Sequence, residues 1–210
     1  MARTRADNYG EKHQLILDTA AEIFAAKGFA SASINDISAA TGMSKSALYH
    51  YHKSKEAILH AILATHVRDL LQAASDATEG VSDPEQRLLR FLEALLGIYA
   101  TARAKHIVLL NQAALLPEPE RREVRTLGRE LVRFAIGVLK PLNPAIMGRA
   151  ELRKPYAMMF YGMVNWTYTW YDAAGPIAPA QLAARMTELF LRGFPHCTAG
   201  VTRARNPARV

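Results

Sequence analysis

Apolar residues recur along this chain at intervals of three and four positions, and seldom at intervals of two. That periodicity is typical of amphipathic α-helices, so the chain predicts an all-α fold. Nine helices are expected from the Gly, Pro and N-cap residues that separate the apolar segments. They fall at about 12–27, at two short segments within 33–56, and at about 55–79, 83–99, 103–115, 119–140, 150–173 and 179–193.

The segment 33–56 combines two short predicted helices with a glycine turn. Ser33 stands at an N-cap position, and Asp36 three residues later completes a variant of the capping box. Gly42 supplies the left-handed residue that ends the first helix, and Ser44 caps the second. Two capped helices at this spacing are typical of a helix-turn-helix, which places its second helix in the major groove of DNA.

The second of these helices carries side chains that suit DNA. Small residues keep its first turn narrow enough to enter a groove, and its outward side chains can donate hydrogen bonds to phosphates and base edges. Lys55, at the start of the next helix, adds a cation where backbone amides already favour a phosphate. The candidate DNA-binding residues from this pattern are Ser44, Lys45, Ser46, Tyr49, His50, Tyr51 and Lys55. The alternative is a pair of surface helices whose Tyr and Lys side chains are only solvated.

The segment from Gly28 to Glu56, with TGMSKSALYHYHKSKE at its centre, resembles the N-terminal domain of the TetR/AcrR family of repressors. With the helix at 12–27, the resemblance covers about the first 65 residues. It implies an all-α homodimer with a variable C-terminal ligand domain, and release of DNA when the ligand binds. By position it implies DNA contacts from Ser33, Ser46, Tyr49, His50, Tyr51 and Lys55.

His52 departs from this family pattern, which usually has Phe or another apolar residue at that position. We expect a buried or half-buried histidine that is hydrogen-bonded to backbone. The alternative is a pH-sensitive DNA-binding domain, because histidine is the side chain that titrates near neutral pH. In that case operator affinity falls between about pH 7.5 and about pH 6 in the wild type and not in His52→Phe.

The 210 residues are long enough for a small DNA-binding domain and a larger body. The predicted division is a DNA-binding domain at 1–54, of which 1–10 form a flexible arm, a ligand-binding and dimerisation domain at 55–195, and a disordered tail at 196–210. The formal charge of +7 suits a polyanionic partner. Because the DNA-binding segment itself has only a small excess of cations, DNA binding is inferred from their placement.

Three features of the chain suit a protein of the cytoplasm that associates with the nucleoid. No apolar run approaches the roughly 20 residues that span a bilayer. The N-terminus has no apolar signal segment. Cys197 is the only cysteine, so no disulfide can form within the chain.

An aromatic and methionine-rich segment at 150–173 is the candidate ligand site. Met159, Met163, Trp166 and Trp170 follow one another at intervals of four, three and four, so they share a face of a continuous helix. Such an adaptable, polarisable lining suits a bulky apolar ligand, and a core stripe or a dimer seam is the alternative. Asn165 and Asn111 are isolated polar residues that either orient a ligand or hydrogen-bond between helices.

The stretch GMVNWTYTWYDAAGPIAPAQLAARM resembles a TetR subgroup that senses acyl-coenzyme A thioesters. The resemblance implies a pocket for an acyl group, with cations near its mouth for the nucleotide phosphates. Arg103 and Arg129 are the candidate cations. Arg129 belongs to a basic series that repeats every four residues from Arg121 to Arg133, and a solvated helix face is the alternative for that series.

The last predicted helix carries an apolar face that suits dimerisation. Its members are Leu182, Met186, Leu189 and Phe190. Packed against the aromatic helix and a second copy of this pair, they would form a four-helix interface. A symmetric dimer would read two half-sites of an inverted repeat, about one helical turn apart.

These features predict a homodimeric transcriptional repressor that binds a palindromic operator in double-stranded DNA and is released by a small effector, with an acyl-CoA thioester favoured. An enzyme is not expected, nor is a cofactor or metal, because no Ser-His-Asp arrangement, phosphate-binding Gly loop or metal-spaced Cys/His cluster is found. Two different functions stay open. One is that of a regulator that responds to a non-CoA aromatic or drug-like ligand, and the second is that of a ligand-independent architectural DNA-binding protein.

Overall fold

The regular elements in residues 2–197 of the computed structural model are all helical, which confirms the all-α prediction. The structure describes those residues, with side chains from Tyr9 onward. The chain runs through α1 (Ala2–Lys27), α2 (Ile34–Thr41), α3 (Lys45–Tyr51), α4 (Lys55–Thr78), α5 (Pro84–Thr101), α6 (Arg103–Gln112), α7 (Glu118–Leu139), α8 (Pro144–Met147), α9 (Ala150–Asn165), α10 (Thr167–Trp170) and α11 (Pro179–Gly193). Short 3-10 turns lie at Ala113–Leu115 and Phe194–His196.

The local signals for α2 and α3 are confirmed. Ser33 caps α2, and its side chain and that of Asp36 form the reciprocal capping box. Gly42 adopts the left-handed conformation, with φ of 68°, and ends α2. Ser44 caps α3 by accepting a hydrogen bond from the backbone N–H of Ala47 at 3.1 Å.

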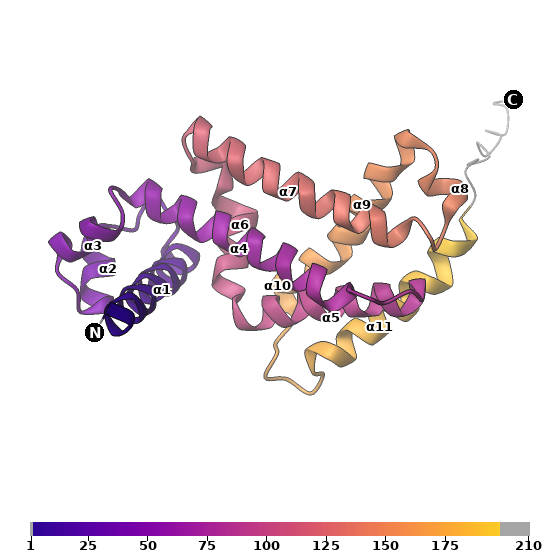
Figure 1. The fold of residues 1–210 in the computed structure, drawn as a ribbon, viewed down its shortest axis with the longest axis horizontal. Helices are drawn as coiled ribbons and strands as arrows, with labels where there is room; N and C mark the ends of the chain where they lie inside the picture. Colours follow the sequence, from indigo (N-terminus) through magenta and orange to yellow (C-terminus); the bar gives the residue numbers. More distant parts are fainter. Residues whose placement is uncertain (1, 198–210) are drawn as a thin grey trace, which may run out of the picture.

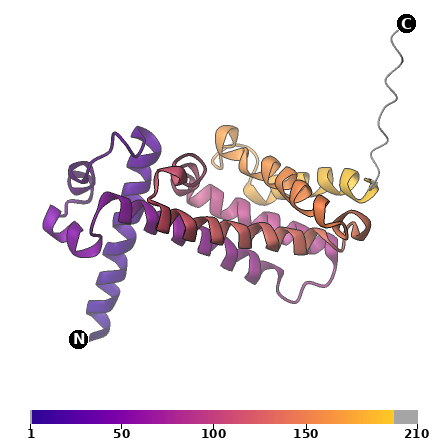
Figure 2. The same cartoon turned by 90° about the horizontal axis from the view of Figure 1, so that it is seen from above.

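Helix α1 begins at Ala2 and so includes residues 2–10 of the predicted arm, whose flexibility stays a prediction. The aromatic ring of Tyr9 stacks on that of Tyr51 in α3, with centroids 4.5 Å apart, and on His13 one turn further along α1. These contacts hold α1 against α3 on either side of Gly10, which offsets the low helix propensity of that residue. The N-terminal part of α1 projects away from the rest of the protein (Figure 2).

The predicted helix at 150–173 is interrupted at Trp166. The hydroxyls of Thr167 and Thr169 each donate to a backbone carbonyl three residues earlier, at 2.7 Å. Such local side-chain hydrogen bonds favour a tighter turn over a continuing α-helix. The segment therefore becomes α9 and the one-turn helix α10. Helix α8 is a further one-turn helix that the apolar periodicity did not predict.

Two apolar clusters fill the protein, and α4 contributes to both. The first lies around α1–α3 and includes Ile58 and Ile62 of α4, together with Ala104 and Val108 of α6. The second lies among α5, α7, α9 and α11 and includes Leu70 of α4. Helix α4 thus leads from the group α1–α3 into the body, as Figure 1 shows.

The predicted domain boundary after residue 54 stays a prediction, although residues of α4 and α6 complete the first cluster. Nearly all of the predicted tail at 196–210 lies outside the described residues. Among the helices described, none is long and apolar enough to cross a membrane.

Candidate DNA-reading head and effector pocket

Helix α3 buries Leu48 and exposes most of the residues that the sequence singled out. Leu48 is 1% exposed and anchors the helix in the first cluster. Tyr49 is 49% exposed and projects from the surface. The other exposed candidates are Ser44, Lys45, Ser46 and His50. This surface is what a groove-reading helix requires, and the DNA contacts of these residues stay predictions.

Lys55 does not extend outward as a DNA contact requires, and that prediction is corrected. Its Nζ donates hydrogen bonds to the carbonyl oxygens of Phe29 and Ala32, both at 2.7 Å. It also lies over the ring of Phe29, 4.3 Å from the centroid. The ammonium group therefore joins the start of α4 to the loop between α1 and α2.

Two further DNA candidates are engaged within the protein. The hydroxyl of Ser33 donates to Asp36 Oδ2 at 2.7 Å, as part of the capping box. The Lys27 ammonium, 2.8 Å from Asp36 Oδ1, and that bond from Ser33 lower the pKa of Asp36 to about 2. Tyr51 is half-buried against Tyr9, which corrects its expected outward position.

His52 is buried, as expected, and only 8% exposed at the end of α3, but the expected hydrogen bond of its side chain to backbone is not found among the described residues. Its ring stacks on that of His13, with centroids 5.0 Å apart, and its Nε2 has no hydrogen-bond partner in the described part of the chain. Burial, with the nearby His13 as a smaller cause, lowers the pKa of His52 to about 4. A pKa this low favours a neutral His52 from about pH 7.5 to about pH 6, and the pH dependence of operator binding stays a prediction.

This lowered pKa predicts acid sensitivity of stability. The unfolded chain binds a proton on His52 near pH 6.5, whereas the folded protein resists protonation until about pH 4. The contribution of His52 to the free energy of unfolding is therefore fully present above pH 6.5. It is lost as the pH falls from there toward pH 4, by about 1.4 kcal/mol per pH unit. We expect the free energy of unfolding in urea to fall about 2 kcal/mol less between pH 7.5 and pH 5 in His52→Phe than in the wild type. Identical pH dependences would contradict this assignment.

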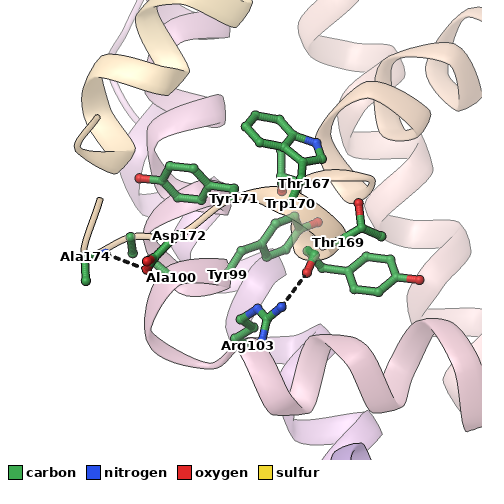
Figure 3. A pocket seen from close by; sticks show the side chains of 11 residues that line it. Tyr99, Ala100, Arg103, Thr167, Thr169, Trp170, Tyr171, Asp172 and Ala174 are labelled. Carbon is green, nitrogen blue, oxygen red and sulfur yellow. Dashed lines mark hydrogen bonds between the residues drawn. The ribbon is translucent and has the colours of Figure 1, made fainter. Parts of the chain in front are cut away.

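A cavity of about 470 Å³ lies where the end of α5 and the start of α6 meet α10 and the loop after it. Figure 3 shows Tyr99, Arg103, Trp170 and Tyr171 around it. Arg103 donates from Nη2 to the carbonyl oxygen of Tyr168 at 2.9 Å, which holds the guanidinium at the rim. The remaining lining residues are Ala100, Thr167, Tyr168, Thr169, Asp172, Ala173 and Ala174.

Two of the predicted ligand residues, Arg103 and Trp170, line this cavity, and Asn165 lies next to it. The Asn165 Oδ1 accepts a hydrogen bond from the hydroxyl of Tyr99 at 2.8 Å. Tyr99, Tyr168 and Tyr171 were missed as lining residues. The break at Trp166 is what turns the last two toward the cavity, and no periodic signal could reveal it.

The other predicted ligand residues do not line this cavity. Met159 and Trp166 are 57% and 63% exposed on the outer side of α9, away from the cavity lining. Met163 packs against the second apolar cluster. Asn111 donates to the carbonyl oxygen of Ile107 on its own helix, and Arg129 donates to Thr126 Oγ1 on its own helix. Neither Asn111 nor Arg129 lines the cavity.

The basic series on α7 follows the solvated alternative. Arg121 and Arg125 both pair with the carboxylate of Glu118 on the same helix. These ion pairs are exposed, so they contribute little to stability.

The dimerisation face predicted on α11 is also corrected. Leu182 and Met186 are each 7% exposed and belong to the second cluster, where α11 packs against α5. Phe190 packs edge-to-face on Phe160, with centroids 5.6 Å apart. Of the four predicted residues, Leu189 alone is largely exposed, at 68%, and available to a partner. The helix is amphipathic as predicted, but its apolar face is covered within the protomer.

Helix α6 links the cavity to the group α1–α3. The side-chain amide of Gln112 donates to the carbonyl oxygen of Phe24 at 2.7 Å and accepts from the backbone N–H of Phe29 at 3.0 Å. At the other end of α6, Lys105 pairs with Asp18 of α1 at 2.6 Å. We call these contacts the α6 bridge. Arg103, in the first turn of the same helix, lies at the cavity.

Both halves of the chain match models of one protein family. Residues 16–62 match the model described as bacterial regulatory proteins of the tetR family. Residues 81–194 match the model described as the tetracyclin repressor-like C-terminal domain. The chain belongs to the TetR family of bacterial transcriptional regulators. It is therefore a DNA-binding regulator and not an enzyme, as its sequence predicts.

Individual relatives agree with this assignment. A TetR-family transcriptional regulator from Bordetella parapertussis 12822 is 39% identical, covers 90% of this regulator and 98% of its own chain, and superposes with a TM-score of 0.82. The transcriptional repressor KstR2 of Mycolicibacterium smegmatis is 22% identical over 85% of this chain and 88% of its own. AibR, solved in complex with isovaleryl coenzyme A and operator DNA, has the same fold, with 23% identity over 85% of this chain and 97% of its own and a TM-score of 0.73.

Proposed function

We propose that this regulator is a homodimeric repressor that binds a palindromic operator and leaves it when an acyl-CoA thioester occupies the cavity beside Arg103. The observation that carries the proposal is the combination of an exposed helix α3 and a separate cavity, with α6 extending from that cavity to α1. The ligand-independent architectural alternative gives the cavity no role.

An exposed stripe on α9 supports the dimer. Met158, Met159, Gly162 and the C-cap residue Trp166 lie on one side of the helix, and all are exposed. Contiguous exposed apolar side chains of this size mark interaction surfaces. A twofold dimer buries the same stripe on both subunits. The group α1–α3 of each subunit, which we call the DNA-reading head, then binds one half of an inverted repeat.

The cavity supports a ligand with an apolar part and an anionic part. Its volume of about 470 Å³ is in the range of small-molecule sites. Tyr99, Tyr168, Trp170 and Tyr171 supply aromatic surface, and Arg103 is the one cation among the lining residues. An acyl group can lie against the aromatic rings while the nucleotide phosphates remain near Arg103 at the rim. The isovaleryl coenzyme A in the AibR complex supports the same ligand class.

Release requires that the ligand bind the DNA-competent arrangement less tightly than another arrangement. Arg103 and the α6 bridge belong to the same ten-residue helix. A ligand that moves the start of α6 therefore changes the contacts of α1 with α6. The two recognition helices then lose the spacing that matches the operator.

Release from the operator can be measured in gel shifts, with the DNA upstream of the regulator's own gene as the probe. We expect isovaleryl-CoA to release the DNA, and free coenzyme A to release it less effectively because it lacks the acyl group. Arg103→Ala should raise the half-release concentration about tenfold, the equivalent of one hydrogen bond to a charged group. The matched control is Arg129→Ala, which removes an arginine away from the cavity.

Retention of the DNA at saturating acyl-CoA would rule out the acyl-CoA effector. The second candidate is then a non-CoA aromatic compound, which the four aromatic side chains of the cavity favour. A thermal-shift panel of acyl-CoA esters and free aromatic compounds separates the two, because only the true ligand class stabilises the folded protein.

A further inference from the structure

Two histidines form a fully buried pair at the junction of α4 and α6. His66 of α4 is 0% exposed and His106 of α6 is 1% exposed. His66 Nε2 and His106 Nδ1 are 3.3 Å apart and share one hydrogen bond. Burial is the main cause that lowers the pKa of His66 to about 4 and that of His106 to about 3, so both rings are neutral at physiological pH.

The pair leaves one donor and one acceptor unused. A neutral imidazole has one N–H and one lone pair, and the shared bond consumes one of each across the two rings. The nitrogens left over are His66 Nδ1 and His106 Nε2, and neither has a partner in the described part of the protein. Whichever ring donates, one of these nitrogens carries a hydrogen and the other does not. Buried polar atoms without partners are costly, so they call for a specific explanation.

One aromatic ring separates the pair from the effector cavity. The ring of Tyr99 stacks on that of His106, with centroids 3.6 Å apart, and Tyr99 also lines the cavity. The hydroxyl of Tyr99 is held by a hydrogen bond that it donates to Asn165. Tyr99 is thus the side chain that lies both against His106 and at the cavity.

We propose that the acyl part of the effector passes Tyr99 and that its carbonyl oxygen accepts the unused N–H of the His66–His106 pair. This inference rests on the proposed function and adds the polar group that recognises the acyl end. The unused acceptor is left for a water or a ligand hydroxyl. Because both rings are neutral, the pair favours an uncharged thioester carbonyl over the carboxylate of a free acid.

The position of the histidine pair also connects binding of the acyl carbonyl to control of DNA binding. His66 belongs to α4, which leads to the DNA-reading head, and His106 belongs to α6, which carries the α6 bridge. A carbonyl bonded at this junction acts directly on the spacing of the two helices. An effector without a polar group at this depth has no such contact.

The test uses the full-length protein with ¹⁵N-labelled histidine and the N-acetylcysteamine thioester of isovalerate, which lacks the nucleotide. We expect the probe to shift the imidazole nitrogen resonances of His66 and His106 and leave those of His52 unchanged, whereas isovalerate shifts none of them. The resonances are assigned with single His→Phe variants. Unchanged His66 and His106 resonances up to the solubility limit of the probe would overturn the proposal.

Affinity measurements on variants provide a second readout. His106→Phe should weaken binding of the thioester about tenfold through the lost hydrogen bond. His106→Gln keeps a donor and an acceptor and should retain more of the affinity. His52→Phe is the matched control, because it makes the same substitution at another buried histidine. Unfolding curves identify any variant that is not folded, and equal affinity of folded His106→Phe and wild type would overturn the site.

The outcomes distinguish this inference from the proposed function. Histidine shifts with the truncated thioester, but no operator release by acyl-CoA, would support the pair and refute the repressor mechanism. Operator release without histidine shifts would support the mechanism and refute the pair. The absence of both effects would refute both.

Discussion

Tyr49→Ala is expected to weaken operator binding about thirtyfold while the free energy of unfolding stays unchanged. The Tyr49 side chain is 49% exposed on α3, so its removal costs little packing. A dimer loses one contact in each half-site, at about 1 kcal/mol each, which gives about thirtyfold in affinity. Fluorescence anisotropy with a labelled operator measures the affinity, and urea unfolding measures the stability.

Lys55→Ala provides the contrasting variant. Its ammonium group bonds two carbonyl oxygens inside the DNA-reading head, so its removal should lower the unfolding free energy by about 2–3 kcal/mol. Affinity should fall only as far as the folded fraction falls. If Lys55→Ala left stability intact and abolished DNA binding, Lys55 would be a DNA contact after all. If Tyr49→Ala bound the operator normally, α3 would not be the reading helix.

Trp166→Glu is expected to convert the dimer into monomers and to lower operator affinity at least about a hundredfold. Trp166 is 63% exposed beside Met158, Met159 and Gly162 on α9, so a dimer would bury it. The substitution places a carboxylate from each subunit in an apolar interface, where an unpaired charge is costly. Each monomer then binds a half-site alone and loses the advantage of two linked sites.

Sedimentation velocity measures the oligomeric state, and gel shifts compare a palindrome with a single half-site. The matched control is Leu115→Glu, which introduces the same charge at a residue that is 52% exposed in the 3-10 turn after α6. We expect this control to remain dimeric. A dimeric Trp166→Glu variant would show that subunits associate through another surface.

The features that the sequence predicts well depend on residues within one turn of each other. The capping box of Ser33 and Asp36, the left-handed Gly42 and the Ser44 cap are all expected from the sequence, and all are present. Each depends on positions only a few residues apart, so no knowledge of the fold is needed. The resemblance to the TetR family rests on this same segment, which explains why the family could be recognised.

The predictions that the structure corrects concern residues whose contact partners lie far from them in the sequence. Lys55 is 26 residues from Phe29, and the direction of its side chain follows from the packing of α4 against that loop. The apolar face of Leu182 and Met186 is buried, but amphipathicity cannot say whether α5 or a second subunit covers it.

The cavity depends on residues far apart in the sequence and on a break within a helix, and the helical period reveals neither. Arg103 and Tyr168 are 65 residues apart in sequence and become neighbours only in the folded chain. Trp170 reaches the cavity through the break at Trp166, whereas Met159 and Trp166 remain outside it. The helical period predicted that Met159, Trp166 and Trp170 share one face of a continuous helix. It gives no sign that threonine hydroxyls bond the backbone and interrupt that helix.

The α6 bridge bears on attempts to build chimeric regulators from this protein. Gln112 satisfies the last turn of α1 and the loop that follows it from a position more than 80 residues later. A segment cut after α4 would leave the Phe29 N–H without its partner and the Phe24 carbonyl with only its bond from Gly28, and it would uncover apolar surface that Ala104 and Val108 now shield. The DNA-reading head is therefore not a portable module. A graft onto another sensor must carry α6 with it, or supply a glutamine at the equivalent place.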